Sequence, residues 1–507
     1  MKRLAELPFL VLLMGFGTVA MFPVVVLAVT EHDWQTARSF LYGGLLFTVL
    51  TALVGFATIN NASTNQARSH LLAMLGFYTV LPLILAVPFA EAQGNTAFLD
   101  AYFEMVSCLT TTGASLFDDP GDLSAALHLW RAIVGWLGGF FLWVTAIAIL
   151  APMNLGGFEV TASPGEGTGS EPRWAAESRQ AANMRERLKR FGAKLMPVYV
   201  GLTAGLWVLM LLAGEGPLVA ACHAMSVLST SGISPVGGVQ YGHSGLLGEF
   251  MLWCFFLFAF SRQTFMLDFR TESWRSLKKD VEIKMGVGIA WVVTFFLFAR
   301  HWLGAYEVSA EEDLLAAVKA LWGTVFTVTS YLTTTGFASN EWIDARDWSG
   351  LATPGLILVG LAVFGGGVAT TAGGVKLLRI YALYKHGLRE MEKLVHPSSV
   401  GGAGAFARRI RRQGAQIAFV FFMLFALSVA MVMTALGAAG LDFEAATILT
   451  VAALTTTGPL AAAATEPSLS YAVLGDGAKI ILAMAMVLGR LETLAIIAFF
   501  NPEFWRN

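Results

Sequence analysis

The sequence predicts an all-α protein that crosses a membrane many times. Of its 507 residues, 56% are hydrophobic and only 13% are charged, whereas soluble domains average ~25% charged residues. A mean hydropathy of +0.64 over this length leaves more apolar surface than one water-exposed fold can bury, and a lipid bilayer accepts that surface. These values exclude a soluble enzyme, a disordered chain and a disulfide scaffold. The three cysteines lie in apolar surroundings and predict no disulfide.

A helix needs about 20 mostly apolar residues to cross the hydrocarbon core. Ten such stretches are present, and glycines interrupt one of them. The first stretch is long and lacks a small-residue cleavage pattern, which favours a retained helix over a signal peptide. The predicted spans are residues 8–29, 40–60, 70–90, 128–151, 195–214, 246–267, 285–304, 351–384, 414–438 and 473–500.

The charged residues predict the orientation of these spans. Most of the 33 Lys and Arg residues fall at the N-terminus or in the segments 152–195, 262–284 and 376–412, and basic loops stay in the cytoplasm. Both termini are therefore expected inside the cell. The opposite loops are acidic and would concentrate cations near an entrance, although ordinary solvation explains each acid taken singly. These acids are Asp118, Asp119, Asp122, Glu341, Asp344, Asp347, Glu466 and Asp476.

Four similar segments rich in threonine and glycine recur at comparable intervals along the chain. Each follows a long apolar stretch, a polar connection and a shorter apolar stretch, and each precedes another long one. An internal repeat of this length predicts four quasi-equivalent modules. The shorter stretches are predicted as half-length, re-entrant pore helices because they do not reach across the bilayer. They cover residues 98–109, 219–229, 314–332 and 442–454.

The four segments have the composition of an ion-selectivity filter. Non-helical backbone is tolerated at membrane depth only where protein or a water-filled cavity covers it, a condition that four loops around one axis meet. Their carbonyl and hydroxyl oxygens can replace the hydration shell of an alkali cation, and glycine permits the positive φ angles that aim successive carbonyls alike. One such segment alone is more often a turn, but four favour a filter. The predicted filter residues are Thr111, Thr112, Gly113, Thr230, Ser231, Gly232, Thr334, Thr335, Gly336, Thr456, Thr457 and Gly458.

At these residues the chain resembles the Trk/Ktr/HKT superfamily of potassium transporters, and most of all its TrkH-type bacterial members. The matching stretches are FLDAYFEMVSCLTTTGAS (98–115), LWRAIVGWLGGF (129–140), FGGGVATTAGGVKLLR (364–379) and GRLETLAIIAFFNPEFW (489–505). The resemblance implies an N-terminal helix pair followed by four helix–pore-helix–helix modules around one pore. The implied boundaries are 1–66 for the pair and 67–155, 156–270, 271–400 and 401–507 for the modules.

The resemblance also implies potassium uptake across the bacterial inner membrane, with K+ at the filter residues and an ion gradient or the membrane potential as the driving force. Glycine at the filter position of the first module goes with potassium in this family, and serine with sodium. Channel-like transport and coupling to Na+ or H+ both stay open, and no organic cofactor is expected. The implied partners are lipid, a second copy in a homodimer and a cytoplasmic nucleotide-binding subunit of the TrkA type, without nucleic acid.

The sequence departs from the family pattern in two filter segments. The second reads Ser229-Thr230-Ser231-Gly232-Ile233, where the family often has an aromatic residue after the glycine. The fourth, Thr457-Gly458-Pro459, is richer in threonine than is usual in the family. These departures leave the degree of discrimination between potassium and sodium open.

Clustered glycines predict a break inside the span 351–384. Each glycine costs ~0.5–1 kcal/mol relative to alanine in a helix interior, so a polar loop is favoured there, which the resemblance identifies as an intramembrane gate. Close helix packing on small residues is the alternative. Lys376 and Arg379, which follow this loop, are expected at the membrane interface, where they either snorkel toward the cytoplasm or contact the regulatory subunit. The predicted gate residues are Gly365, Gly366, Gly367, Thr370, Thr371, Gly373, Gly374 and Arg490.

Arg490 lies inside the last apolar stretch. A charge at the bilayer centre costs ~2.5–3.5 kcal/mol on insertion scales, so this side chain should face the protein interior. The resemblance places it beneath the filter, where it would repel a cation or bind the gate loop. A structural ion pair is the alternative reading, with Glu492, Glu104 or Glu444 as the partner.

Three functions other than potassium uptake are alternatives for a chain of this kind. The sequence has no P-loop, dinucleotide fingerprint or nucleophile elbow, and its eight histidines are scattered, so neither an intrinsic ATPase nor another enzyme is expected. A polytopic membrane enzyme would need a cluster of catalytic residues at an interface. The ion-binding subunit of a potassium-pumping ATPase complex and a sodium-permeable transporter of the same fold remain alternatives.

Overall fold

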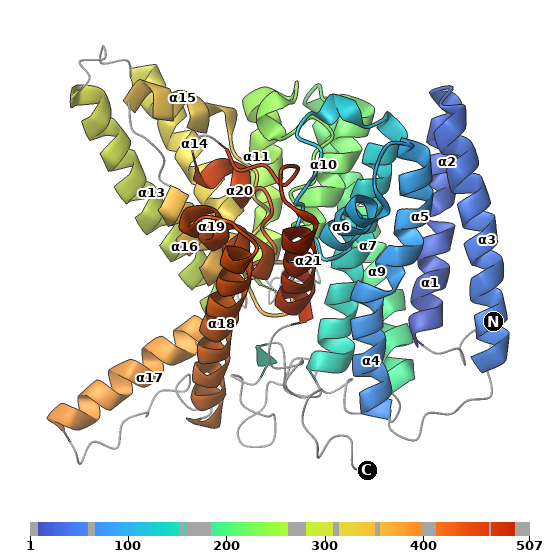
Figure 1. Cartoon of the computed structure of the whole chain (residues 1–507). Coiled ribbons are helices and arrows are strands. Elements are labelled where there is room, and N and C mark those ends of the chain that lie inside the picture. Colours follow the sequence, from blue (N-terminus) through green and yellow to red (C-terminus); the bar gives the residue numbers. More distant parts are fainter. Residues whose placement is uncertain are drawn as a thin grey trace.

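The computed structural model describes residues 9–58, 66–151, 157–158, 184–261, 280–307, 314–349, 355–396, 412–465 and 468–491. The described residues form helices and connecting loops, with no strand among them. Most helices run roughly along one direction, and α17 projects obliquely from one end of the assembly (Figure 1). The predicted all-α membrane fold is confirmed.

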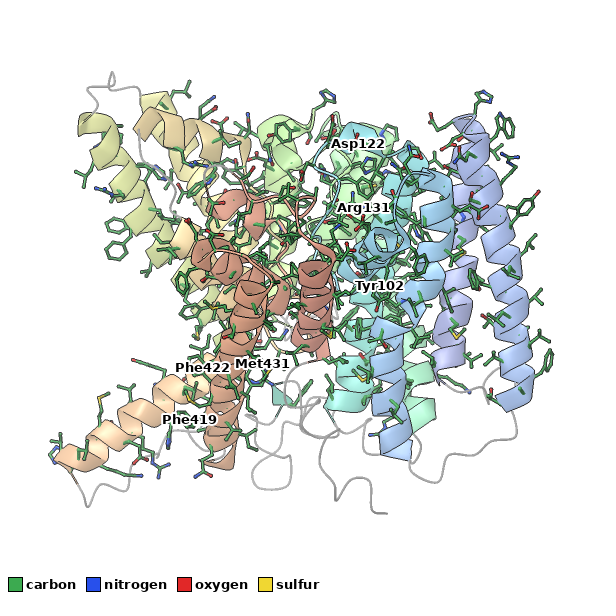
Figure 2. All side chains as sticks on the ribbon, viewed as in Figure 1. Tyr102, Asp122, Arg131, Phe419, Phe422 and Met431 are labelled. Atoms are coloured by element: carbon green, nitrogen blue, oxygen red, sulfur yellow. The ribbon has the colours of Figure 1, made fainter. Side chains whose placement is uncertain are left out.

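Within the described ranges, eight helical stretches are long and apolar enough to cross a membrane. Exposed apolar side chains cover the outer helices; Phe419, Phe422 and Met431 of α18 are examples (Figure 2). Such a surface is stable only against lipid. The eight stretches are Leu10–Thr30, Trp34–Thr58, Leu72–Gln93, Ala125–Leu150, Arg187–Leu212, Val281–Ala305, Leu315–Leu332 and Gly414–Ala438.

The long helices carry short breaks that follow the local sequence. The first span divides between Val19 and Met21, and the third divides at Val80 beside Pro82, because proline at the second position of a helix lacks an N–H to continue the preceding one. The elements are α1 (Phe9–Val19), α2 (Met21–Thr30), α3 (Trp34–Thr58), α4 (Gln66–Thr79), α5 (Leu81–Gln93), α7 (Ala125–Thr145) with the π-helical turn η3 (Ala146–Leu150), α9 (Met184–Leu212), α13 (Val281–Glu307), α15 (Asn340–Ser349) and α18 (Arg412–Ala438).

Among the predicted spans, one has a shorter helix than expected within the described residues, one is divided and one is described only in part. The stretch 246–267 is helical only through α11 (Gly245–Phe256) and the 3-10 turn η6 (Leu257–Ala259), and the next polar residue, Ser261, bonds to Asp280 instead of continuing a helix. The stretch 351–384 is divided, as its glycines predict, into α16 (Gly355–Phe364) and α17 (Leu377–Val395). The last is helical over α21 (Asp476–Leu491), and its remainder lies outside the described residues.

Four helices end at the four threonine-rich segments. They are α6 (Phe98–Leu109), α10 (Pro217–Ser229), α14 (Leu314–Leu332) and α19 (Phe443–Leu454). Three have 12 or 13 residues, as expected of half-length helices. α14 has the predicted bounds, but its 19 residues exceed half-length and meet the length and composition of a membrane-spanning helix.

These four helices are packed into a closed series. α7 packs on α10, α11 packs on α14, and α16 packs on α19. The last helix, α21, packs on the first of the four, α6, and lies near the centre of the assembly (Figure 1). The ends of the four short helices are thereby brought together from distant parts of the sequence.

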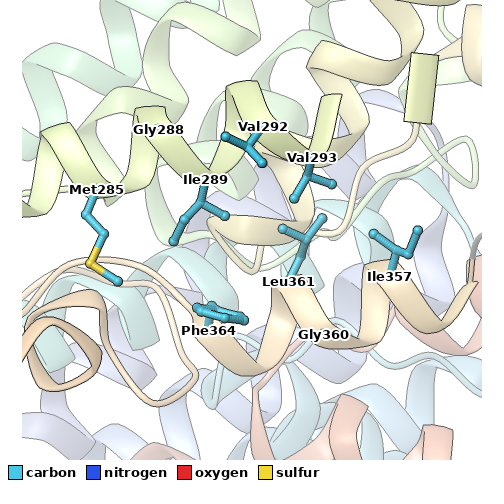
Figure 3. Close-up of a pocket in the computed structure, with 9 residues that line it drawn as sticks. All are labelled: Met285, Gly288, Ile289, Val292, Val293, Ile357, Gly360, Leu361 and Phe364. Atoms are coloured by element: carbon cyan, nitrogen blue, oxygen red, sulfur yellow. The ribbon is translucent and has the colours of Figure 1, made fainter. Parts of the chain in front are cut away.

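An apolar groove of about 570 Å³ lies between α13 and α16 (Figure 3). Gly288 and Gly360, which leave open space where a Cβ would lie, are part of its lining. Its lining has no charged or hydrogen-bonding side chain, so it is unsuited to an ion and faces the lipid phase. The main lining side chains are Met285, Ile289, Val293, Ile357, Leu361 and Phe364.

Candidate functional site

The four short helices end in the same hydrogen-bonded turn. At the end of α6, the N–H of Thr112 donates to the carbonyl of Ser107 (2.8 Å) and the N–H of Thr111 donates to that of Cys108 (2.9 Å). This pair of bonds defines the Schellman motif. The equivalent bonds in the other three turns run from Ser231 to Ser226 and Thr230 to Val227, from Thr335 to Ser330 and Thr334 to Tyr331, and from Thr457 to Ala452 and Thr456 to Ala453.

A threonine occupies the strained position of every turn. A Schellman motif requires one left-handed residue, usually glycine, and a side chain there costs roughly 1–2 kcal/mol. Here φ is 52°, 51°, 56° and 54° at Thr111, Thr230, Thr334 and Thr456. Seven non-glycine residues have a positive φ in the described part of the chain, and two more of them, Ala369 and Lys376, lie in the loop 365–376. Strain concentrated in this way marks functional backbone.

Hydroxyl groups brace each strained threonine from both sides. The side chains before and after it form a hydrogen bond: Thr110–Thr112 (2.8 Å), Ser229–Ser231 (3.0 Å), Thr333–Thr335 (3.1 Å) and Thr455–Thr457 (3.2 Å). The buried hydroxyls of Thr111 and Thr456 have no partner among the described protein groups. Buried polar atoms without a protein partner are candidates for water or a ligand.

The four turns are in close contact with one another. The N–H of Gly458 donates to the carbonyl of Thr112 at 2.6 Å, which joins the fourth turn to the first. A Cβ atom on Gly113 would lie 1.9 Å from the carbonyl oxygen of Ser231 in the second turn, and one on Gly232 would lie 2.4 Å from that of Thr335 in the third. These glycines are therefore required for close approach as well as for their positive φ angles of 73° and 65°.

Pro459 links the fourth turn to two others. Its ring atoms lie within contact distance of the α-carbons of Gly232 and Gly336, so that a Cβ on either glycine would meet the ring at 2.7 and 3.1 Å. The next residue begins α20 (Leu460–Ala464). Tyr471 then donates its hydroxyl to the carbonyl of Gly458 at 3.0 Å. The departure from the family pattern at Pro459 is thus part of the packing between turns.

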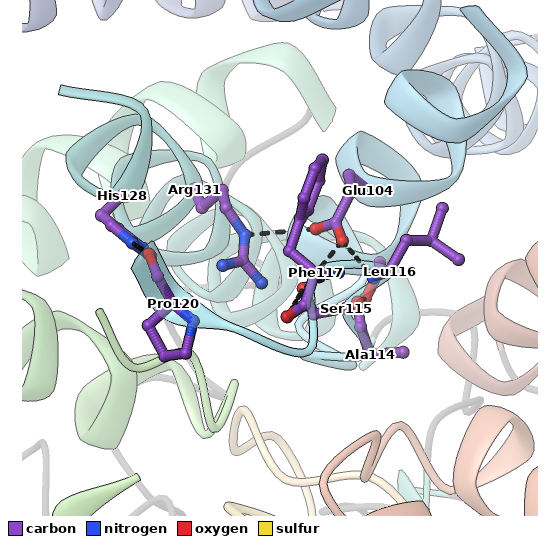
Figure 4. A network of polar contacts seen from close by, with 9 residues as sticks. Glu104, Ala114, Ser115, Leu116, Phe117, Pro120, His128 and Arg131 are labelled. Atoms are coloured by element: carbon purple, nitrogen blue, oxygen red, sulfur yellow. Dashed lines mark hydrogen bonds and ion pairs between the residues drawn. The ribbon is translucent and has the colours of Figure 1, made fainter. Parts of the chain in front are cut away.

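A buried carboxylate supports the first turn. Glu104 on α6 is fully buried, and its Oε1 accepts hydrogen bonds from the N–H of Leu116 (2.6 Å) and the hydroxyl of Ser115 (2.9 Å). Its Oε2 accepts from Nε of Arg131 on α7 at 3.1 Å (Figure 4). The expectation that Glu104 pairs with Arg490 is wrong. The charged partner of Glu104 is Arg131, whereas Arg490 donates to the carbonyl of Thr371.

Replacing Glu104 by Gln is expected to lower both the rate of ion uptake and the unfolding temperature of the protein. The substitution leaves the buried Arg131 charge without its counter-ion, and breaking a buried pair on one side costs about 3–5 kcal/mol. Thermal unfolding in detergent measures the effect, with Glu444→Gln on the exposed surface of α19 as the control. The double variant Glu104→Gln/Arg131→Met removes both charges and should recover part of the loss; no recovery would contradict the pairing as its cause.

A second buried carboxylate supports the third turn from a neighbouring helix. Glu249 lies on α11, and its Oε2 accepts from Nε1 of Trp322 (2.9 Å) and from the hydroxyl of Ser339 (2.6 Å). Its Oε1 accepts from the N–H of Asn340 (3.0 Å). Neither this contact nor the Glu104 pair was predicted, although a charge inside a short apolar helix is a usable signal for each.

Glu215 organises the loop between α9 and α10. It accepts hydrogen bonds from the backbone N–H groups of Gly216, His243 and Ser244, at 3.1 to 3.2 Å. Burial raises the pKa of Glu215, but hydrogen bonds from the Ser244 side chain and from these backbone N–H groups together lower it by more, so the pKa lies below its usual value. This carboxylate lies outside the spans and belongs to neither the four turns nor the loop 365–376.

The loop 365–376 lies against the second, third and fourth turns. The N–H of Gly373 donates to Oγ1 of Thr334 at 2.7 Å, and Oγ1 of Thr371 donates to the carbonyl of Leu228 at 3.1 Å. A Cβ on Gly373 would lie 2.1 Å from the carbonyl oxygen of Thr455. Arg490, 4% exposed, donates from Nη1 to the carbonyl of Thr371 at 2.7 Å. The structure therefore brings Arg490 and the glycine-rich loop together.

Several of the predictions for single charged residues are corrected by the structure or concern residues outside the described part of the chain. Lys376 and Arg379 are not interfacial: Lys376 donates to the carbonyl of Ala372, and the Arg379 guanidinium lies 3.7 Å from the Phe421 ring centroid, a cation–π contact that stabilises the buried charge. Of the other partners expected for Arg490, Glu444 is exposed. The third, Glu492, lies outside the described residues, as do Glu466 and the side chain of Asp347.

These features define a polytopic membrane transport protein. Residues 251–506 match the TrkH family, described as a cation transport protein. The Trk system potassium uptake protein TrkH of Salmonella typhimurium is 30% identical over 447 residues, which cover 87% of each chain. The Trk system potassium uptake protein TrkG of Escherichia coli is 26% identical over 498 residues, which cover 97% of this chain and 96% of TrkG.

The fold has a solved counterpart. The crystal structure of the potassium transporter TrkH from Vibrio parahaemolyticus matches with a TM-score of 0.81 and 24% identity over 100% of both chains. The chain belongs to the TrkH family of cation transport proteins. This membership agrees with the predicted family and with the prediction that the chain is not an enzyme.

Proposed function

We propose that this chain is the membrane subunit of a potassium-uptake system and that K+ passes between the four threonine-rich turns. The observation that carries the proposal is the repeated strained turn, whose carbonyl and hydroxyl oxygens meet from four parts of the sequence. Oxygen ligands of this kind replace the hydration shell of an alkali cation. The names of the relatives support potassium as the ion.

The proposed K+ ligands are the backbone and side-chain oxygens of the predicted filter residues. Their threonine and serine side chains are at most 1% exposed, so an ion among them is shielded from bulk water. The unpartnered hydroxyls of Thr111 and Thr456 are the strongest candidates for direct contact. Glycine occupies the filter positions 113, 232, 336 and 458. Gly113 supports potassium over sodium, since sodium transporters of this family have serine at the position in the first module.

The proposed gate is the loop 365–376 together with Arg490. The loop contacts the second, third and fourth turns, and Arg490 holds the carbonyl of Thr371. A fixed positive charge at this place disfavours a cation until the loop moves. Movement of Thr371 and Gly373 away from the turns would open the path.

The remaining features of the uptake system are proposed from the resemblance and the charge pattern. The chain would lie in the bacterial inner membrane with both termini in the cytoplasm, divided into the five segments given above. Relatives named as parts of a Trk system support a multi-component assembly, here a homodimer with a nucleotide-binding subunit of the TrkA type. Transport would be driven by an ion gradient or the membrane potential, with or without Na+ or H+ as a coupling ion.

Uptake of rubidium into proteoliposomes tests this function. Vesicles that contain the chain, with and without the cytoplasmic partner, are loaded with potassium and offered labelled rubidium in the presence of excess sodium. Selective rubidium uptake is the expected result. Equal uptake of sodium would favour the sodium-permeable alternative, whereas uptake only when ATP is hydrolysed by an added complex would favour the pumping alternative.

A further inference from the structure

The loop 365–376 is also held at the start of α13. Oε1 of Glu282, in the first turn of that helix, accepts a hydrogen bond from the N–H of Val368 at 2.7 Å. Glu282 is only 5% exposed. A carboxylate this buried needs hydrogen-bond donors or a counter-ion, and the loop backbone supplies one of them.

The preceding residue of the loop is held by a second element. The N–H of Gly367 donates to the carbonyl of Ala259 at 2.9 Å, at the end of η6. Two consecutive N–H groups of the loop therefore bind two different segments. Gly367 has no space for a side chain, because a Cβ would lie 2.1 Å from the carbonyl oxygen of Phe260.

A further bridge joins those two segments to each other. Ser261 donates its hydroxyl to Oδ2 of Asp280 at 2.6 Å, and Oδ1 of Asp280 accepts from the N–H of Glu282 at 2.9 Å. Ala259, Ser261, Asp280 and Glu282 thus form one hydrogen-bonded unit with Gly367 and Val368, which we call the loop anchor. Ser261 and Asp280 are the residues that flank the segment 262–279 in the sequence.

We infer that Glu282 is a positioning residue for the gate and that the loop anchor couples displacement of residues Ser261 and Asp280 to movement of the loop 365–376. This inference rests on the proposed gating role of that loop. Separation of Ser261 from Asp280 pulls Ala259 and Glu282 apart, so at least one of the bonds to Gly367 and Val368 must break.

Rubidium uptake by the chain alone tests the role of Glu282. Glu282→Ala removes the acceptor of the Val368 N–H, and loss of a hydrogen bond to a charged group is expected to raise uptake without the partner by about tenfold. Glu282→Gln retains an Oε1 acceptor and should stay within about threefold of the unaltered chain. Asp280→Ala, which breaks the anchor without touching the loop, should raise uptake in the same direction.

Glu215→Ala is the matched control. It removes another buried carboxylate that accepts backbone N–H groups, but far from the loop anchor in sequence and contacts, and it should not raise uptake. The preference for rubidium over sodium should be unchanged in Glu282→Ala, because its contacts do not include the four turns. A general structural defect would lower uptake and would not be rescued by Gln.

The inference is overturned if folded Glu282→Ala protein, judged by its elution profile and unfolding temperature, takes up rubidium no faster than the unaltered chain. If that variant does not fold, Ser261→Ala/Asp280→Ala provides the second test, and unchanged or slower uptake there overturns the inference equally. Absence of rubidium uptake by the unaltered chain with its partner present would instead overturn the proposed function.

Discussion

Replacing Gly113 by Ser is expected to raise sodium uptake relative to rubidium uptake by about tenfold, which corresponds to ~1.4 kcal/mol. The new Cβ would lie 1.9 Å from the carbonyl oxygen of Ser231, so one of the two turns must move. The positive φ of 73° adds strain for any side chain. A displaced carbonyl no longer matches the larger ion, and discrimination against sodium decreases. Competitive uptake into proteoliposomes measures the ratio.

A glycine on α18 provides the control for this prediction. Gly437 has no atom within 4 Å of a hypothetical Cβ, so Gly437→Ser should leave both the uptake rate and the ion ratio unchanged. Gly113→Ser protein that transports at the original ratio would argue that the first turn does not select the ion. The same result would remove the close approach of the turns as the reason for glycine at this position.

Replacing Arg490 by Gln is expected to raise rubidium uptake by the chain alone by on the order of tenfold. The charge-assisted bond from Nη1 to the carbonyl of Thr371 would be lost or weakened, and such bonds are roughly twice as strong as neutral ones. Removal of the buried positive charge also favours a cation at this place. The measurement is initial-rate uptake without the cytoplasmic partner.

Two further variants interpret the Arg490 result. Arg490→Lys keeps the charge and should retain most of the restriction, whereas Arg300→Gln on the exposed surface of α13 should change nothing. Equal uptake by Arg490→Gln, Arg490→Lys and the unaltered chain would contradict a gating role for this residue. Higher uptake by both Arg490 variants would assign the effect to the shape of the guanidinium and its hydrogen bond, with no contribution from charge.

The pattern of threonine and glycine predicted where the four turns lie because both residue types are needed locally. Its physical interpretation was incomplete. Positive φ angles were expected at the glycines, and Gly113 has one, but Thr111 has one as well. The reason is that the left-handed position of a helix-ending turn comes directly after the last helical residues, two positions before the glycine. Gly458 lacks a positive φ altogether, since Pro459 and the first turn fix its conformation.

The sequence alone did not predict which residues distant along the chain are in contact. The sequence offers Glu104 only as one of three possible partners of Arg490, and only the fold places Arg131 beside it. Arg379 follows an apolar stretch, as interfacial residues do, and the sequence does not show that its guanidinium lies over the ring of Phe421. Hydropathy also does not separate a pore helix from a spanning one, which is why α14 is predicted as half-length although its 19 residues also meet the length of a spanning helix.

The fourth turn and the last helix, α21, complete the contacts among the four turns. This order affects how the protein folds during its synthesis. The first turn receives a hydrogen bond from Gly458, and α21 packs on α6, where Lys479 bonds to Asp100 at 2.5 Å. While the ribosome is still translating the final segment, the first three turns lack their fourth neighbour. Long-range contacts of this kind form late in folding. The ion pathway therefore completes only when synthesis is almost finished, and a prematurely terminated chain cannot assemble it.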